Sequence, residues 1–356
     1  MNRYPRLLVS REKIRENAFR VICRCAEAGI SVAGVVKGVC AHPSVVRTFI
    51  EGGCEELADS RMKNIAALRE MKTGLPLLLL RIPMPSEIPL VAEMADCSLV
   101  SMADTVRLLE SECKFLSSTI EVIVMIDLGD LREGLWLNDT EKMTEALRAS
   151  PRIKCSGVGV NFGCFGGTLP TPEKLVTLLS IGREMERTLG YPLSVFSGGG
   201  TSSLLLLEKN VVPEGINHLR IGEGILLGED VTSMRSIPWL HQKTMVLEAE
   251  VVEVRRKPSV PAEPRGADAF GGRIHFPERG NRLRAIFAVG RQDVKIDGLI
   301  PEAEGALILG GSSDHLIVDV EDVRPVPVLG DIFRFFPDYG ALLALSTSPY
   351  AALEMV

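Results

Sequence analysis

Between residue 11 and about residue 235, apolar runs that fit buried strands alternate with stretches whose apolar residues recur at helical spacing, such as Met62–Met71 and Pro172–Leu189. Parallel strands that are buried on both faces read as continuous apolar runs. Eight such runs joined by helices predict a closed parallel barrel ringed by helices, and a doubly wound open sheet is the alternative. The expected strands are Ser31–Val36, Glu55–Ala58, Pro76–Ile82, Asp96–Val100, Ile120–Ile126, Lys154–Val160, Leu193–Phe196 and His218–Ile221.

The pattern changes near Ile237–His241, after which strand-like segments are linked by turns rich in proline and glycine. We therefore expect an α/β fold in which a (β/α)8 TIM barrel over residues 1–235 precedes an all-β domain over residues 236–356. The first ten or so residues are candidates for packing on the β domain. Pro258–Gly272 is too irregular for a helix or strand and is interpreted as an ordered functional loop. The expected β-domain strands are Thr244–Arg255, Leu283–Ala288, Ala306–Leu309, Leu316–Val320, Asp331–Phe336 and Leu342–Leu345.

A barrel of this kind places its chemistry at the carboxyl ends of its strands. A polar residue closes each of the eight expected strands, and solvation alone explains that poorly, so the pattern indicates an enzyme. The residues are Lys37, Asp59 with Ser60, Arg81, Ser101, Asp127, Asn161, Ser197 with Gly198, and Arg220.

The amino-acid composition limits the classes of partner that such an enzyme is expected to bind. The 356 residues include 40 Lys and Arg against 46 Asp and Glu, a net charge of −6, with no long basic run. This disfavours nucleic acid and anionic membranes, so we expect a small-molecule partner. No apolar run approaches the ~20 residues that cross a bilayer, and no signal segment is recognised, so a cytoplasmic protein is expected. The eight cysteines form no C-x-x-C pair, which predicts reduced, mostly buried thiols and no metal site.

Lys37 directly follows the apolar run Val32–Val36. Its ammonium is therefore expected at the barrel mouth beside low-dielectric walls, which lower the pKa of an amine. That is the setting of a Schiff-base lysine. The plain alternative is a lysine whose stem packs on the strand end while its head reaches water.

Two glycine-bearing segments close the last two strands. Ser197–Ser203 contains three consecutive glycines, which let backbone amides approach an anion, followed by hydroxyl residues at a helix start; a flexible loop is the alternative. Arg220–Gly224 supplies a second such loop and a fixed guanidinium. Barrel phosphate sites are frequently built by these two loops. Together with Lys37, they outline a cofactor with an aldehyde at one end and a phosphate at the other, which is pyridoxal phosphate.

Further motifs extend this pattern along the chain. They are Val35-Val36-Lys37, Asp59-Ser60-Arg61, Arg81-Ile82-Pro83, Met125-Ile126-Asp127-Leu128-Gly129-Asp130-Leu131-Arg132-Glu133-Gly134, Gly157-Val158-Gly159-Val160-Asn161, Ser197-Gly198-Gly199, Leu219-Arg220-Ile221-Gly222-Glu223 and Gly311-Ser312-Ser313-Asp314-His315. On these residues the chain resembles the alanine racemase family of pyridoxal-phosphate enzymes over nearly its full length, and its ornithine racemase branch more closely.

The resemblance implies roles for particular residues. Lys37 would carry the cofactor, Arg220 would face the pyridine nitrogen, and Arg132 would organise the substrate end. Asn161 stands where alanine racemases carry a histidine that stacks on the ring. The implied phosphate end consists of Ser202, Gly222 and Glu223, within the segments that also contain Ser197, Gly198, Gly199 and Thr201.

The sequence also departs from that family. Met125 replaces a lysine that is often carbamylated in alanine racemases, and Cys40-Ala41-His42 replaces a phosphate-contacting tyrosine. The loop that holds their catalytic tyrosine has Gly266-Ala267-Asp268-Ala269-Phe270 as its nearest counterpart, which contains no tyrosine. The sequence therefore leaves the second acid–base residue open.

Racemisation removes the α-proton from one face of the substrate and returns it from the other, so two groups must flank the cofactor. Lys37 supplies one. For the other, Asp268 is the first candidate, Asp314 or His315 the second, and Cys164 the third. The structural alternatives are carboxylates that stabilise turns and a loop imidazole. In the family, the β domain of one subunit completes the site of its partner, so the resemblance implies a homodimer.

Arg220 has a consequence for the chemistry at the ring. A guanidinium has a pKa above ~12 and no acceptor, so it donates to the pyridine nitrogen without readily protonating it, which disfavours transamination. The expected reaction is racemisation of ornithine first, lysine next and alanine last, because Asp130, Glu133, Asp268 and Asp314 could meet a distal ammonium. The alternatives are a basic amino acid decarboxylase of the same fold and a non-catalytic cofactor carrier.

Overall fold

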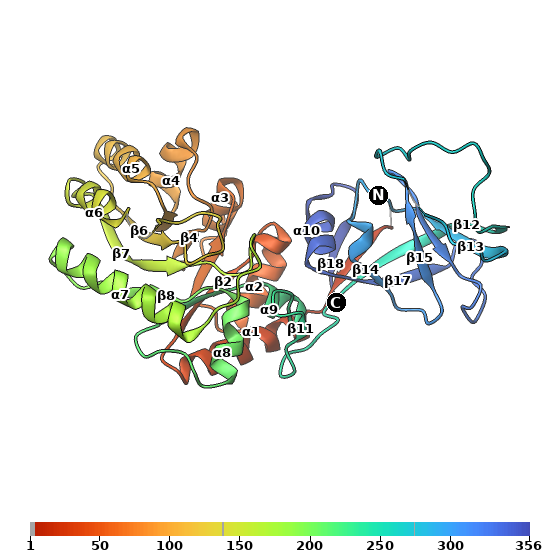
Figure 1. The fold of residues 1–356 in the computed structure, drawn as a ribbon, viewed down its shortest axis with the longest axis horizontal. Coiled ribbons are helices and arrows are strands. Elements are labelled where there is room, and N and C mark those ends of the chain that lie inside the picture. The colour runs from red at the N-terminus through yellow and green to blue at the C-terminus, as the bar shows by residue number, and fades with distance from the viewer. Residues whose placement is uncertain (1–3, 137–138, 274) are drawn as a thin grey trace. The chain divides into compact units, whose positions relative to one another are not determined.

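The structure is a computed structural model that describes residues 4–136, 139–273 and 275–356. The chain forms two compact units. We call residues 11–242 the barrel unit, and residues 4–10 with 243–356 the β unit. Figure 1 shows helices around the strands of the barrel unit (red to green), and mainly strands in the β unit, most of which is blue.

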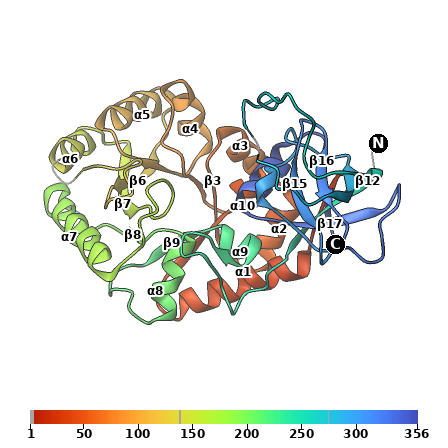
Figure 2. The ribbon, with the colours of Figure 1, turned by 45° about the vertical axis from the view of Figure 1, so that its right-hand side comes forward.

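The barrel unit is a closed barrel of parallel strands in the order β2-β3-β4-β5-β6-β7-β8-β9, and β9 pairs with β2 to complete the ring. This confirms the predicted barrel and rejects the open sheet. The helices between successive strands lie outside the ring (Figure 2). The strands are β2 Ser31–Val35, β3 Glu56–Asp59, β4 Leu77–Leu79, β5 Cys97–Val100, β6 Ile120–Ile126, β7 Ile153–Val160, β8 Val195–Ser197 and β9 His218–Ile221; a short hairpin, β10 Glu229–Asp230 and β11 Arg235–Ser236, follows.

The outer helices follow from amphipathic patterns and local caps. Helix α1, for example, buries Ile14, Ala18, Val21 and Cys25 along one face. Helix α7 begins where Thr171 Oγ1 accepts a hydrogen bond from the Lys174 amide. The helices are α1 Arg11–Ala26, α2 Pro43–Glu51, α3 Met62–Glu70, α4 Ile88–Met94, α5 Ala103–Leu116, α6 Thr140–Arg148, α7 Pro172–Leu189, α8 Leu204–Glu208 and α9 Glu223–Leu227, with 3₁₀ turns η1 Lys37–Val39, η2 Pro85–Glu87 and η3 Thr201–Ser203.

Alternate residues of the strands fill the barrel interior. Because successive side chains on a strand point to opposite faces, residues two apart, such as Ala33 and Val35, or Ile123 and Met125, enter the same core. Met125 is fully buried there. The polar residues that continue these inward positions therefore lie at the ends of a packed apolar core rather than along an open channel.

The β unit is built around one sheet in the order β14-β17-β12-β13-β16-β15. Strand β1 joins it by pairing antiparallel with β12 and parallel with β18, which brings the two ends of the chain into one sheet. The elements are β1 Arg6–Val9, β12 Met245–Pro258, β13 Asn281–Phe287, η4 Ile296–Gly298, β14 Leu299–Pro301, β15 Leu307–Gly311, β16 Leu316–Asp319, β17 Ile332–Pro337, α10 Tyr339–Thr347 and β18 Ala352–Met355.

One element of the β unit differs from its sequence prediction. Leu342–Leu345 lies in helix α10, so the predicted strand there is wrong. Asp338 caps the helix by accepting a hydrogen bond from the Ala341 amide, and the helix buries Ala341, Leu342 and Leu345. A short apolar run fits either element, and here the cap decides.

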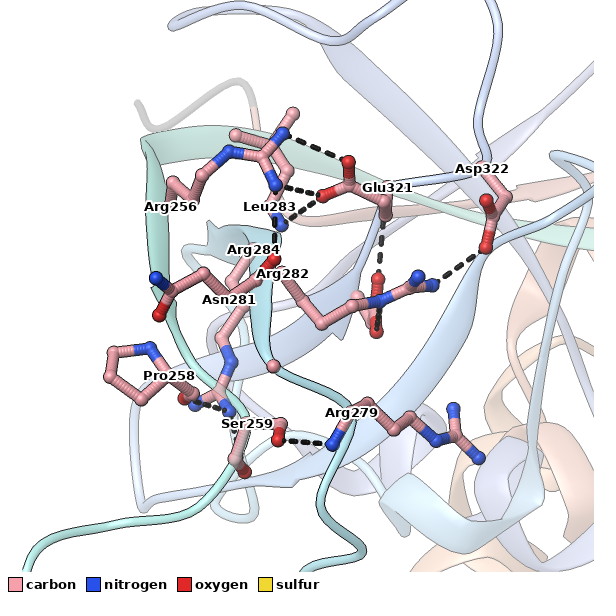
Figure 3. Close-up of polar contacts among 12 residues, drawn as sticks. Arg256, Pro258, Ser259, Arg279, Asn281, Arg282, Leu283, Arg284, Glu321 and Asp322 are labelled. Atoms are coloured by element: carbon pink, nitrogen blue, oxygen red, sulfur yellow. Dashed lines mark hydrogen bonds and ion pairs between the residues drawn. The ribbon is translucent and has the colours of Figure 1, made fainter.

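Residues 259–273 and 275–280 belong to a loop with no helix or strand among these described positions, and its neck is held where β12 ends and β13 begins. The Arg284 guanidinium donates to the carbonyls of Pro258 and Ser259, and the Arg279 amide donates to Ser259 Oγ at 2.7 Å (Figure 3). Beside the neck, Arg256 pairs with Glu321, and Arg282 pairs with Asp322. The neck is therefore held by several cross-strand contacts.

Among the described residues, no helix combines the length and the apolar character that crossing a bilayer requires.

Candidate active site

The predicted chemical residues of the barrel unit gather at the carboxyl ends of neighbouring strands. Lys37 follows β2, Asn161 follows β7, Ser197 ends β8, and Arg220 lies in β9. In a closed barrel, β9 lies between β8 and β2, so Arg220 is positioned between the Ser197 strand and the Lys37 strand. The structure thus brings these side chains to one mouth of the barrel.

Lys37 begins the turn η1, and its Nζ has no hydrogen-bond or ion-pair partner within the described parts of the chain. Burial lowers the pKa of the lysine, and the positive charge of Arg132 lowers it further. The charges of Cys164 and Asp59 act in the opposite direction but are outweighed by burial. The half-buried Lys37 amine is therefore biased toward its neutral, nucleophilic form.

Arg220 is buried and held by oxygen acceptors without a carboxylate in direct contact. Its Nη2 donates to the Val160 carbonyl at 2.6 Å and to Asn161 Oδ1 at 2.9 Å, and its Nη1 donates to Ser197 Oγ. Burial lowers the pKa of Arg220 to about 10. The side chain remains a cation at neutral pH. Both of its Nη groups are held by oxygen acceptors.

Asn161 links Arg220 to a second arginine. Its Nδ2 donates to Glu133 Oε1 at 2.7 Å, and the same carboxylate pairs with Arg132. Because the Asn161 amide accepts from one arginine and donates to the carboxylate of the other, its orientation is fixed by both neighbours. Arg220, Asn161, Glu133 and Arg132 therefore form one continuous polar network at the mouth.

The two glycine-bearing loops leave backbone donors unused. Within the described residues, the amides of Ser202 and Gly222 and the hydroxyl of Ser202 donate no hydrogen bond, although both residues are buried. A Cβ added at Gly222 would lie 2.9 Å from the Val35 carbonyl oxygen, so the loop runs too close to β2 for any side chain. Thr201 Oγ1 accepts from the Gly224 amide at 3.1 Å and ties the loops together. Buried free amides beside a hydroxyl suit a phosphate.

Three candidates for the second acid–base residue belong to the β unit. Asp268 Oδ1 accepts hydrogen bonds from the amides of Phe270 and Gly272, which is the turn-stabilising arrangement. Asp314 accepts from Ser313 Oγ and from Gln292 Nε2. His315 is exposed, and its ring has no hydrogen-bond partner among the residues described. Asp268 and Asp314 thus have local partners, whereas the imidazole does not.

Cys164, the remaining candidate, lies in the barrel unit in the loop after β7. The residue is exposed, and a negative charge on its sulfur would raise the pKa of both Lys37 and Arg220. The same loop is fixed by Asp130, which accepts from the amides of Phe165 and Gly166. Asp130 is therefore engaged in holding this loop, although the sequence offered it as a partner for a substrate ammonium.

Sequence reasoning assigned no site role to Glu56 and His218, and it did not recognise that Glu133 joins Arg132 to Asn161. His218 Nδ1 lies 2.7 Å from Ser197 Oγ, and its Nε2 lies 3.1 Å from Glu56 Oε2. The available signal was the spacing of His218 and Arg220, two polar residues on the same face of a strand that is otherwise apolar. The contact with Glu56, 162 positions away, left no local signal.

Comparisons with known proteins agree with this architecture. The profile of the family described as "Alanine racemase, N-terminal domain" matches residues 9–229. A lysine racemase of Thermotoga maritima is 43% identical over 98% of this chain and 97% of its own length. An ornithine racemase of Acetoanaerobium sticklandii is 38% identical over 99% of this chain and 100% of its own.

Solved structures share the fold at low sequence identity. An alanine racemase from Bartonella henselae with covalently bound pyridoxal phosphate has a TM-score of 0.76 at 14% identity, covering 100% of both chains. An alanine racemase from Streptomyces lavendulae has a TM-score of 0.75 at 16% identity, covering 100% of this chain and 98% of its own. At these identities the likeness supports the fold alone.

Proposed function

The chain belongs to the alanine racemase family and is an amino acid racemase, and from that premise we propose that it interconverts the enantiomers of ornithine and lysine with pyridoxal 5′-phosphate as its cofactor. One observation carries the cofactor proposal. A half-buried lysine, Lys37, and the buried residues Ser202 and Gly222 lie at the carboxyl ends of strands in the same closed barrel, and among the described residues neither the Lys37 amine nor the two backbone amides have a hydrogen-bond partner. Amine and amides are the groups that an aldehyde and a phosphate require.

The residues present fit this cofactor. Lys37 would hold it covalently, Ser202, Gly222 and Glu223 would receive the phosphate, and Arg220 would face the ring nitrogen. When bound, the cofactor supplies an electron sink that makes the α-proton of an attached amino acid acidic. Arg220 has only donors, so it orients the ring nitrogen without giving up its own proton at neutral pH. This favours racemisation over transamination.

Lys37 is proposed to move the α-proton on one face. Its lowered pKa favours the neutral amine, which can accept a proton from the α-carbon, and the resulting ammonium can return it. Arg132 sits beside Glu133 and Asn161 and would organise the substrate carboxylate through its guanidinium. The α-proton on the opposite face would be moved by Asp268, Asp314, His315 or Cys164.

A homodimer is part of the proposal. Asp268, Asp314 and His315 are carried by the β unit, whereas Lys37 and Arg220 belong to the barrel unit. A second copy of the chain could supply these groups to the Lys37 site. Sedimentation at working concentration tests this, because a fully active monomer would contradict it.

The preference for a distal ammonium is supported by the two relatives, which are a lysine racemase and an ornithine racemase. Glu133 is the carboxylate of the barrel mouth that could attract such an ammonium, but it is already paired with Arg132. Racemisation rates measured side by side for ornithine, lysine and alanine decide the substrate class. Alanine as the best substrate would contradict the proposal.

The central experiment combines reduction and polarimetry. Borohydride treatment of the purified yellow holoprotein followed by peptide mapping should place the reduced cofactor on Lys37, and L-ornithine or L-lysine should lose optical rotation without releasing gas. A modified residue other than Lys37 would overturn the site. Release of carbon dioxide would instead indicate a decarboxylase, and constant rotation without gas would indicate a cofactor carrier.

The second acid–base residue is identified by matched single variants. Asp268→Asn, Asp314→Asn, His315→Gln and Cys164→Ser each remove one proton-transfer group with little change of shape. The correct variant should slow racemisation by roughly 10²–10⁴-fold from both enantiomers, while solvent-hydrogen exchange persists from only one of them. A variant that only loosens a turn should lower thermal stability and retain exchange from both enantiomers.

A further inference from the structure

We propose that Ser197, His218 and Glu56 form a one-directional hydrogen-bond relay that positions Arg220 and connects the two mouths of the barrel. The consequence for reaction choice rests on the proposed function, whereas the relay itself is a property of the barrel core. His218 and Glu56 are thus assigned as positioning residues that act through Arg220.

The relay consists of consecutive contacts between side chains on neighbouring strands. Arg220 Nη1 donates to Ser197 Oγ, Ser197 Oγ lies 2.7 Å from His218 Nδ1, and His218 Nε2 lies 3.1 Å from Glu56 Oε2. Ser197 on β8 stands opposite His218 on β9 in the sheet register. His218 and Arg220, two positions apart on β9, point to the same side of the strand. The backbone pairing therefore fixes the order in which these side chains follow one another in the relay.

The chemistry of the first donor sets the direction of every later bond. A guanidinium has no acceptor, so Ser197 Oγ must accept from Arg220. A hydroxyl has a single proton, and His218 Nδ1 is the partner toward which that proton can point. Nδ1 must then be unprotonated, which leaves the imidazole proton on Nε2 and directs it to the Glu56 carboxylate. The contacts thus determine a neutral His218 with its proton on Nε2.

The far end of the relay opens at the opposite mouth of the barrel. A cavity of about 940 Å³ is lined there by residues that include the first positions of several strands. The Glu56 side chain is 25% exposed, whereas that of His218 is 4% exposed. Lys154 and Arg69 also line this cavity, but they pair with Glu121 and Asp96. Glu56 is therefore anchored to His218 and still reaches the cavity.

The relay explains how a buried cation is held without a carboxylate beside it. Desolvation disfavours the charge of Arg220, and each oxygen acceptor offsets part of that cost. Glu133, beyond Asn161, and Glu56, at the end of the relay, both raise the pKa of Arg220 from a distance, Glu133 by more. Because these charges act through intervening neutral groups, the outer face of the guanidinium is left free of a competing carboxylate and can donate to a ring nitrogen.

The direction of the relay is tested by nitrogen NMR on the full-length chain, with and without cofactor. In long-range ¹H–¹⁵N spectra, His218 should show a pyridine-type Nδ1 and a pyrrole-type Nε2. The variant His218→Gln assigns the signal among the five histidines. Two pyrrole-type nitrogens, or a proton on Nδ1, would overturn the relay. This outcome does not depend on racemase activity, so it is separable from failure of the proposed function.

Three substitutions test whether the relay acts on Arg220. His218→Leu breaks it, His218→Gln keeps one donor and one acceptor, and Glu56→Gln keeps the shape but removes the charge. We expect His218→Leu to lower kcat roughly tenfold, to shift the cofactor absorbance band and to raise the share of keto acid product, with His218→Gln restoring part of each. Glu56→Gln should shift the band in the same direction by less.

A matched pair elsewhere controls for general effects. His241 Nε2 lies 2.6 Å from Glu16 Oε2, outside the relay. His241→Gln should leave the absorbance band, kcat and keto acid share unchanged. If His218→Leu lowered only thermal stability, or altered these three readouts no more than His241→Gln, then His218 would be a structural residue and the proposal would fail.

Discussion

Arg220 in the barrel unit and Arg282 in the β unit carry the same side chain but meet opposite kinds of partner. Arg282 donates to Asp319 at 2.9 Å and to Asp322 at 2.6 Å, and these carboxylates raise its pKa. Arg220 meets a carbonyl, an amide oxygen and a hydroxyl, and burial lowers its pKa. The β unit neutralises its arginine, whereas the barrel mouth keeps the charge of Arg220 available.

Lys37 extends the comparison, because its amine too has no paired carboxylate among the described residues, and burial lowers its pKa. A charge that is fully paired with opposite charges stabilises a fold, but it interacts only weakly with a ligand. The Arg220 cation and the Lys37 amine at the barrel mouth therefore mark the place where stability is given up for chemistry.

Lys37→Met has the largest expected effect. Racemisation should fall by at least ~10³-fold because the base and the cofactor anchor disappear. The cofactor-free variant should nevertheless melt several degrees higher. The lysine pKa is lower in the folded chain than in the unfolded one, so as pH falls below ~10.4 the unfolded chain takes up a proton that the folded chain resists, and stability is lost. Met removes that loss.

Calorimetry of the cofactor-free chain at pH 7 and pH 10 checks this prediction. The difference in Tm between Lys37→Met and the original chain should be larger at pH 7. An unchanged Tm at both pH values would mean that burial of the amine costs nothing.

Arg220→Glu replaces the uncompensated cation with an acid. We expect racemisation to fall roughly 10²-fold and keto acid formation per turnover to rise, because a carboxyl group can protonate the ring nitrogen. Arg220→Lys is the matched control, since it keeps the charge but loses the fork. Equal product ratios in the two variants would show that the charge at this position does not govern the choice of reaction.

Arg282→Ala removes the compensated arginine instead. Asp319, which is buried, loses its cationic partner, so Tm should fall by a few degrees while kcat and KM at low temperature stay unchanged. Asp322→Asn, which removes only the exposed partner, should lower Tm by less. A loss of kcat without a loss of Tm would contradict the structural role of this pair.

The smallest expected effect is the change in the pKa of Lys37 when Arg132 is replaced by Met. The charge of Arg132 lowers the pKa of Lys37, so its removal should move the midpoint of Lys37 modification by an aldehyde and borohydride upward by a fraction of a pH unit. Glu133→Gln should move the midpoint downward, because the Glu133 carboxylate raises the same pKa. Identical shifts in both variants would indicate a structural rather than electrostatic cause.

Much of the barrel could be predicted because each strand is marked by a short apolar run in the sequence. The run Ile120–Ile126, for example, was predicted with the same bounds that β6 has. Strand β1 was missed because only four residues form it, and their partners are near residues 245 and 352. Leu342–Leu345 was assigned the wrong element because its cap, Asp338, lies outside the apolar run.

In the candidate site too, residues with a local sequence signal could be predicted, and residues that depend on distant contacts could not. Lys37 and Arg220 were predicted because they close strands, and a strand end can be located from local sequence. Glu56 and His218 sit at strand beginnings, where the barrel rule predicts no chemistry, and their contact depends on the closed register of the sheet. Asp268 was proposed from its loop position, but its turn could be seen only once the amides of Phe270 and Gly272 were placed.

The discontinuous β unit has a consequence for how the polypeptide is made. Strand β1 leaves the ribosome before the barrel unit, yet Val9 pairs with Met245, which is 236 positions later. At ~5–20 residues per second, β1 waits on the order of ten to fifty seconds for its neighbour while the intervening barrel emerges. A truncated gene that begins at residue 243 would lack β1 and expose the edges of β12 and β18 during translation, so the two units cannot be separated by cutting the chain at one point.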